Sequence, residues 1–300
     1  MIVKEIESGK KLRRSYKLAK FRDFELLLFT YLGQQGYLSR NIFYYYIGKK
    51  FYKSKKSFDR RILKLKKEGW IDECPNIIPT EVSNTGLMYI TQKTIDKLEF
   101  YYPYTLDPFY DKYNFLSINP SEYEVLGQEP SQTTTKHDYK LSGVRFELEK
   151  YGLKEWKSSN LLRYYKSSLR YKGYRYSGEH KADATFKTKL EGDRDFIELE
   201  LTKKNPKRIE EILKFFFAEN YHRNRRVFYI FGDSKVKNWF VKTVFRKKWF
   251  KEIHTTYYET VFYTTLANVL NANSKTNISF KAARKSKYRN YDRLNLANII

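Results

Sequence analysis

Near its start, the chain has three short segments with apolar residues at helical spacing. Within residues 21–32, FRDFELLLFTYL, the apolar positions are Phe24, Leu27, Leu28 and Tyr31. This spacing predicts an amphipathic helix that ends at the glycines that follow, Gly33 and Gly36. A second, short helix is expected after Ser39, a favourable N-cap residue, with Phe43 and Ile47 on its apolar side.

The third segment, KSKKSFDRRILKLKKEGW at 53–70, combines an apolar stripe with a basic surface. Phe58, Ile62 and Leu65 fall on one face of the predicted helix. Basic side chains fall largely on its other faces, at Lys55, Lys56, Arg60, Lys64 and Lys67. We rank Arg60 and Arg61 first as contacts to a nucleic acid, and their spacing leaves open which of the two points outward.

Two strands are expected after this helix. One begins at Trp70 and Ile71, the other is LMYIT at 87–91, and a turn-rich stretch joins them. Three helices followed by a hairpin are typical of a winged helix-turn-helix, in which the third helix enters the major groove and the hairpin lies on adjacent phosphates. Such a domain binds either DNA or another protein, and the basic third helix favours DNA.

The second half of the chain predicts a mixed α/β core. A helix is expected over 143–151, and strands are expected in HKADATFKTKL at 180–190 and DFIELELTKK at 195–204. Asn205 and Pro206 then begin a helix whose apolar stripe is Ile209, Ile212, Leu213 and Phe216. A buried strand in RRVFYIFGD and a helix in KVKNWFVKTV complete the pattern. The predicted fold class is therefore α+β.

Acidic residues lie on the two predicted strands of this basic protein. Asp183 is on the first, and Glu198 and Glu200 share one face of the second because side chains alternate along a strand. Metal-dependent nucleases of the PD-(D/E)xK type use such an arrangement, in which two carboxylates, here Asp183 and Glu198, hold Mg²⁺. The lysine that normally follows two residues after the second acid is replaced by Glu200, and Lys181 or Lys214 is the candidate substitute. The alternative is that the acids form ion pairs with neighbouring lysines.

Charge narrows the class of partner. The chain has 59 Lys and Arg against 34 Asp and Glu, a formal net charge of +25. Because an excess this large favours a polyphosphate, we expect double-stranded DNA to be bound with a strong salt dependence. No segment pairs a basic face with a continuous apolar one, so a membrane surface is not expected as a partner.

The single cysteine, Cys74, excludes an internal disulfide framework. The start of the chain has no apolar run of the secretory type, and a cytoplasmic protein is expected.

The charge is unevenly distributed. Residues 1–100 have a balance of +10, residues 101–136 of −3, residues 137–270 of +12 and residues 271–300 of +6. These shifts predict a basic N-terminal arm with a winged-helix domain over 1–100 and an acidic linker over 101–136. A nuclease-like domain over 137–270 and a basic tail over 271–300 complete the predicted organisation.

Four stretches of the second half resemble the replication-relaxation family of plasmid and mobile-element proteins. They are TKHDYKLSGVRFELEK at 135–150, KADATF at 181–186, FIELELTKK at 196–204 and ILKFFFAENY at 212–221. The resemblance implies an N-terminal winged helix, a restriction-endonuclease-like C-terminal domain and a role in handling DNA. It places the family's His-Asp pair at His137 and Asp138.

Three functions are consistent with these patterns. The first is DNA binding in replication, mobilisation or maintenance of a mobile element, with an inactive nuclease-like core. The second is a Mg²⁺-dependent DNA endonuclease. The third is an adaptor that recruits another replication or DNA-processing protein through the winged helix. The sequence has no coiled-coil seam that would indicate an oligomer.

Overall fold

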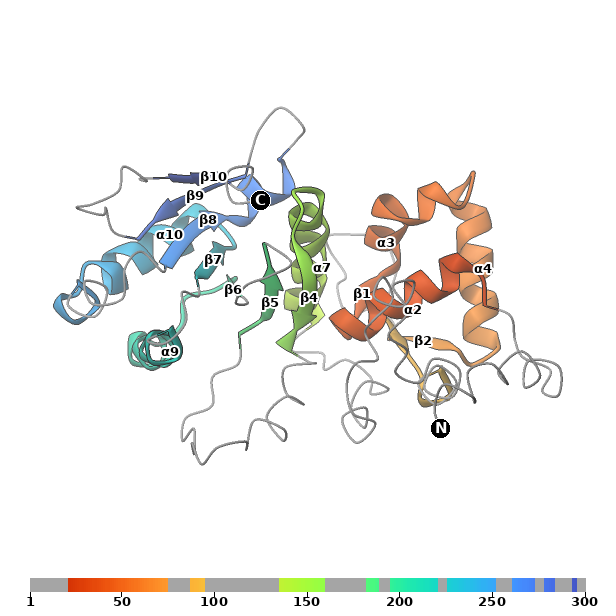
Figure 1. Ribbon diagram of the computed structural model, residues 1–300, viewed down its shortest axis with the longest axis horizontal. Helices are drawn as coiled ribbons and strands as arrows, with labels where there is room; N and C mark the ends of the chain where they lie inside the picture. The colour runs from red at the N-terminus through yellow and green to blue at the C-terminus, as the bar shows by residue number, and fades with distance from the viewer. Residues whose placement is uncertain are drawn as a thin grey trace, which may run out of the picture.

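Two β-sheets organise the protein, as the computed structural model shows (Figure 1). The structure describes residues 21–74, 87–94, 135–159, 182–188, 195–220, 226–251, 261–272, 278–283 and 293–295. The predicted α+β class is confirmed by the helices and sheets of these segments. None of the helices in these segments has both the length and the apolar composition needed to cross a bilayer.

The described part of the N-terminal unit contains three helices and a small antiparallel sheet. The helices are α2 (Asp23–Gln35), α3 (Arg40–Tyr46) and α4 (Lys55–Lys67), with a 3-10 turn η1 (Gly48–Lys50) before α4. The sheet has the order β1-β3-β2, formed by β1 (Leu38–Ser39), β3 (Leu87–Ile90) and β2 (Ile71–Cys74). The three helices lie within three residues of their predicted limits, and α4 has the clearest apolar stripe of the three.

Two helix N-caps and the close packing of one glycine stabilise the N-terminal unit. The side chain of Ser39 accepts a hydrogen bond from the Ile42 amide at the start of α3, as predicted, and Ser54 caps α4 in the same way. The predicted stripe of α4 is buried in a shared core. Gly48 allows η1 to lie against this core, since a Cβ there would come within 2.9 Å of the Tyr44 ring and 3.0 Å of the Phe58 ring.

The larger sheet has seven strands in the order β10-β9-β8-β7-β6-β5-β4. Strand β7 is central and runs parallel to both of its neighbours, β6 and β8, whereas the other pairs are antiparallel. The strands are β4 (Lys154–Ser158), β5 (Ala184–Lys187), β6 (Asp195–Glu200), β7 (Val227–Phe231), β8 (Val261–Thr265), β9 (Ser279–Ala282) and β10 (Arg293–Asn295).

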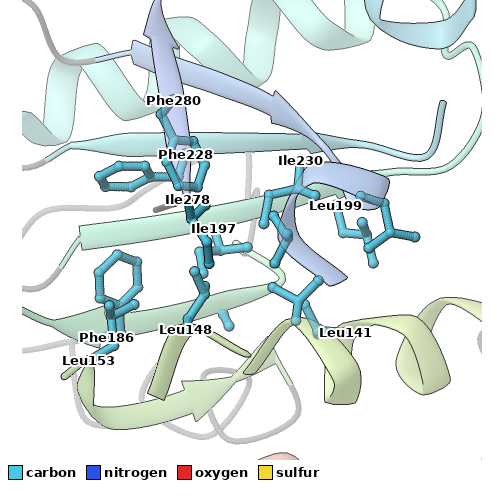
Figure 2. Close-up of a cluster of buried hydrophobic side chains, with 14 of the residues drawn as sticks. Leu141, Leu148, Leu153, Phe186, Ile197, Leu199, Phe228, Ile230, Ile278 and Phe280 are labelled. Carbon is cyan, nitrogen blue, oxygen red and sulfur yellow. The ribbon is translucent and has the colours of Figure 1, made fainter. Parts of the chain in front are cut away.

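Helices cover both faces of this sheet. On one face lie α7 (Thr135–Lys150) and α12 (Leu266–Leu270), and Figure 2 shows Leu141 and Leu148 of α7 against the apolar side chains of the strands. On the other lie α9 (Pro206–Asn220), α10 (Ser234–Phe240) and the π-helical segment η3 (Val241–Phe245). Because both faces are covered, every residue of β7 is buried. The predicted start of α9 is confirmed, with the Lys207 amide 2.9 Å from Asn205 Oδ1.

Two parts of the second half differ from the sequence-based expectation. Helix α7 begins at Thr135, eight residues before the expected residue 143. Its added turns carry polar residues whose partners are distant in sequence, with His137 against Asp183 and Ser142 against the Tyr37 carbonyl. The region 271–300, expected to be a basic tail, contributes β9 and β10 to the sheet. Both strands are short and alternate weakly, and each is held by pairing rather than by a local pattern: β9 pairs with β8, and β10 pairs with β9.

Helix α7 contributes side chains to two hydrophobic cores, that of the N-terminal unit and that on one face of the large sheet. Leu141, Val144 and Leu148 pack on the large sheet, whereas Phe146 packs into the N-terminal unit. The Phe146 ring stacks between those of Tyr31 and Tyr46, with centroids 5.0 Å from each. Figure 1 shows α7 between the N-terminal helices and the sheet.

A buried arginine completes this junction. The Arg145 guanidinium lies over the Tyr31 ring at 4.2 Å and donates to the Tyr31 carbonyl and the Gln34 amide oxygen. Its Nε donates to Glu149 at 2.8 Å, and Glu149 also accepts from the Tyr31 hydroxyl at 2.9 Å. Only 1% of Arg145 is exposed, so each of these contacts replaces a hydrogen bond to water.

Arg145→Met is expected to lower the free energy of unfolding by about 2–4 kcal/mol, because Glu149 and Gln34 lose their buried partner. Urea unfolding measures this change. Arg208→Met, an exposed arginine on α9, is the control and is expected to stay within about 0.5 kcal/mol of wild type. Equal stability of the two variants would contradict a structural role for Arg145.

Candidate functional site

Asp183 is held over the neighbouring strand by two hydrogen bonds. It directly precedes β5, and its Oδ2 accepts from the Leu199 amide of β6 at 2.7 Å. The same oxygen lies 3.1 Å from His137 Nε2, on the first turn of α7. Three elements distant in sequence therefore meet at this carboxylate.

His137 is placed as a charged partner of that carboxylate. Its Nε2 is also 3.2 Å from the Leu199 carbonyl, and its Nδ1 is 3.4 Å from Asp138 Oδ1, so both ring nitrogens face acceptors. Burial lowers the pKa of the imidazole, but the hydrogen bonds to Asp138 and Asp183 outweigh burial and raise it to about 10. Burial conversely raises the pKa of Asp183, and the hydrogen bond and charge of His137 reverse that change and lower it. The pair is therefore an ion pair at neutral pH.

Two more carboxylates come from β6. Phe196 packs towards α9, and Ile197 and Leu199 pack towards α7, so Glu198 and Glu200 follow Phe196 towards the α9 side. Both are buried. Tyr229 of β7 is directly opposite Glu198 in the register, and burial followed by the charges of the acids raises the pKa of its hydroxyl well above 10.

Lys204, four residues after Glu200, supplies a second cation. Its Nζ lies 2.8 Å from Glu200 Oε1, whereas Glu200 Oε2 is buried with no hydrogen-bond partner in the described segments. Burial raises the pKa of Glu200, Lys204 opposes this change and the nearby Glu198 adds to it, and the net result is a pKa of about 7. At Lys204 burial lowers the pKa, but the attraction of Glu200, Glu198 and Asp183 raises it overall. Lys204 is therefore charged on both sides of pH 7, while Glu200 changes its charge there.

The structure brings together only some of the predicted residues. Asp183, Glu198 and Glu200 form one acidic cluster, which here also includes His137 and Lys204. Lys181 lies outside the described residues. Lys214 lies on α9, and its side chain is outside the described part. Lys204 and His137 were missed as site residues. The Thr-Lys-Lys run after β6 and the His-Asp pair in the first turn of α7 were the available signals, but only the tertiary fold shows that they converge.

The acidic cluster suits a particular mode of Mg²⁺ binding. In the described part of the chain no three His, Cys, Asp or Glu side chains are grouped to hold a metal ion. Mg²⁺ in nucleotide-processing sites is typically bound by one or two carboxylates, and waters and phosphate oxygens complete its shell. Asp183 and Glu198 are the two carboxylates that the sequence assigned to such an ion, and the described residues around them form no all-protein cage. Without a metal, His137 and Lys204 already balance two of the three carboxylates.

A second candidate site is the exposed face of α4. Its buried stripe faces the core, and the opposite side presents exposed residues at helical spacing: Lys56, Arg60, Leu63, Lys64 and Lys67. Several flanking lysines are paired, with Lys55 at 2.8 Å from Asp59 and Lys66 at 3.1 Å from Asp72. We call the five exposed residues the α4 face.

Three charges of the α4 face are not balanced locally. Lys64 lies 3.8 Å from Glu68, an exposed pair of small energetic weight. Lys56, Arg60 and Lys67 have no ion-pair partner among the residues that the structure describes. They lie at i, i+4 and i+11, so they form a single row of positive charge on one side of the helix.

The structure distinguishes the two adjacent arginines. Arg60 is exposed on the α4 face. Arg61 turns inward, and its guanidinium lies 2.6 Å from the fully buried Glu25 of α2. Arg61 thus joins α4 to α2, and of the two only Arg60 is available to a partner that docks on the exposed side.

Comparison of the chain with protein-family models, with curated proteins and with solved structures found no match. The resemblance to the replication-relaxation family therefore rests on the four short motifs alone. Function has to be argued from the acidic cluster and the α4 face.

Glu200→Gln is expected to change how stability depends on pH. A carboxyl with a pKa of about 7 in the folded state and 4.5 in the unfolded state keeps its proton longer when folded, so stability falls as pH rises from about 4.5 to 7. This loss is roughly 2–3 kcal/mol in wild type, and it is absent in the variant because glutamine mimics the neutral acid.

Urea unfolding at pH 5 and pH 8 in EDTA-containing buffer measures this difference. Glu211→Gln, an exposed acid on α9, is the control and should follow the wild-type pH dependence. Parallel pH profiles for wild type and Glu200→Gln would show that the Glu200 carboxyl titrates normally.

Proposed function

We propose that this protein binds double-stranded DNA through its N-terminal unit, in the replication, mobilisation or maintenance of a mobile genetic element. Three described helices followed by strands of the antiparallel sheet β1-β3-β2 support the proposal of a winged helix, with α4 as its third helix. The observation that carries the proposal is the row of exposed, locally unbalanced cations Lys56, Arg60 and Lys67. The host process rests on the resemblance to the replication-relaxation family.

The α4 face matches the chemistry of duplex DNA. An α-helix fits the major groove, where Arg bonds guanine edges and Lys bonds phosphates or guanine. Leu65 and Ile62 anchor the helix from behind, and the Ser54 cap fixes its first turn, so the exposed face is presented without a change of fold. Phosphate contacts from several such side chains give strong salt dependence.

In this proposal the larger sheet is a scaffold. Its order α7-β4-β5-β6-α9-β7 is compatible with the proposed restriction-endonuclease-like core, and β8, β9 and β10 extend the sheet. The acidic cluster is largely neutralised by His137 and Lys204, which is consistent with a structural role. Helix α7 connects this scaffold to the DNA-binding unit.

Replacing Lys56, Arg60 and Lys67 together by Gln is expected to weaken duplex binding at least tenfold at moderate salt. The plot of log affinity against log salt concentration should also become less steep. Its slope is expected to fall in magnitude by about 1–3, because each lost phosphate contact removes about 0.9. Fluorescence anisotropy with a labelled duplex, over a salt series, gives both values.

The matched control is a variant in which Gln replaces Lys235, Lys242 and Arg246. These three residues are exposed, carry the same total charge as the three α4 residues and lie on the larger domain. If the triple α4 variant binds with wild-type affinity and salt dependence, α4 is not the DNA-binding surface. That result would favour the adaptor function, in which α4 contacts a protein.

A second candidate function is Mg²⁺-dependent DNA cleavage. The observation that favours it is the convergence of Asp183, Glu198 and Lys204, which restores a lysine beside two carboxylates although residue 200 is Glu. Mg²⁺ bound there would activate water and stabilise charge on the scissile phosphate. Asp183 and Glu198 would hold the ion, Lys204 would offset negative charge, and His137 would orient Asp183.

Under this second function, supercoiled plasmid is nicked by wild type with Mg²⁺ or Mn²⁺, and Glu198→Ala abolishes nicking while duplex binding stays within about twofold. Agarose gels quantify the nicked form, and Glu211→Gln is the control for preparation. Equal nicking by Glu198→Ala indicates a contaminating nuclease. Salt-dependent binding without nicking by any of the proteins favours the scaffold role.

A further inference from the structure

An apolar side chain lies within the cationic α4 face. Leu63 is 54% exposed, which is unusual for a leucine in the described segments, where most are buried. A single exposed leucine is ordinary on a protein surface. The position of Leu63 is not ordinary, because Arg60 precedes it by three residues, Lys67 follows it by four and Lys56 precedes it by seven, so all three lie beside it on the helix.

The surroundings of Leu63 limit what it can contact. A partner that covers this face must also accept Arg60, Lys56 and Lys67, which have no ion-pair partner in the described part of the chain, so the partner we infer is a polyanion. Phosphates offer Leu63 no favourable apolar contact, and the carbon atoms of the sugars are the same for every base. The major-groove edges of duplex DNA offer one apolar group, the 5-methyl group of thymine.

We propose that Leu63 contacts a thymine 5-methyl group in the major groove and so makes a thymine part of the DNA site. This inference rests on the proposed DNA-binding function and deepens it, because it assigns a base preference to one residue. Arg60, one helical turn before Leu63, then lies over an adjacent base pair or its phosphate. The cations supply affinity for any duplex, and Leu63 supplies discrimination.

The test replaces thymine by deoxyuridine, which lacks only the methyl group. Full-length protein first selects duplexes from a random 20-base-pair library, and each thymine of the enriched sequence is then changed singly to deoxyuridine. One position is expected to weaken binding by about fourfold, the effect of removing one buried methyl group. Leu63→Ala is expected to reduce this ratio to about one, whereas Leu63→Met, which keeps an apolar side chain, retains it.

The outcomes separate this inference from the proposed function. If the triple α4 variant loses binding but no thymine is sensitive to deoxyuridine, DNA binding stands and the role of Leu63 is overturned. An unchanged ratio in Leu63→Ala overturns it as well, and so does the enrichment of no sequence. If the triple α4 variant binds as wild type, both the DNA-binding role of α4 and the inference fail.

Discussion

The packing of α7 against two cores is the constraint on which the arrangement of this molecule depends. From Leu141 to Leu148 every side chain of the helix is buried, a pattern typical of a helix enclosed on all sides. Apolar residues on one side meet the sheet, and Phe146 meets the N-terminal unit. The charged residues between them are accommodated because Arg145 meets Tyr31 and Gln34, and Glu147 meets Tyr46 and Lys150. One rigid helix thus links the proposed DNA-binding unit to the acidic cluster.

Charge compensation explains how that cluster is tolerated. Three carboxylates close together in a partly dehydrated place repel one another, and each costs free energy to bury. The chain offsets this with His137 from α7 and Lys204 from the segment after β6. At Glu200 burial outweighs the ion pair with Lys204, and for that reason its pKa lies near neutrality. The same balance leaves two possibilities open to experiment, a structural cluster and a site completed by Mg²⁺ and phosphate.

Much of the sequence-based prediction came from the local spacing of apolar and polar residues. The stripes of α4 and α9, the caps at Ser39 and Asn205 and the shared face of Glu198 and Glu200 follow from spacing alone. Features set by distant contacts were not accessible in this way. The early start of α7 depends on Asp183, 46 residues after His137. The inward turn of Arg61 depends on Glu25, 36 residues before it, and the place of Lys204 depends on the chain path after β6. Neighbours along the sequence do not encode these positions.

The order of the strands also has a kinetic consequence. The N-terminal unit pairs segments close in sequence, whereas the large sheet joins segments from residue 154 to residue 295 and places two parallel pairs at its centre. Non-local parallel pairing is slow, and domains fold as units from the N-terminus during synthesis. The N-terminal unit therefore forms while α7 still lacks most of its sheet. Until β8 and β9 emerge, Leu141, Val144 and Leu148 remain accessible, and chains stalled or truncated in this interval are the species most prone to aggregate.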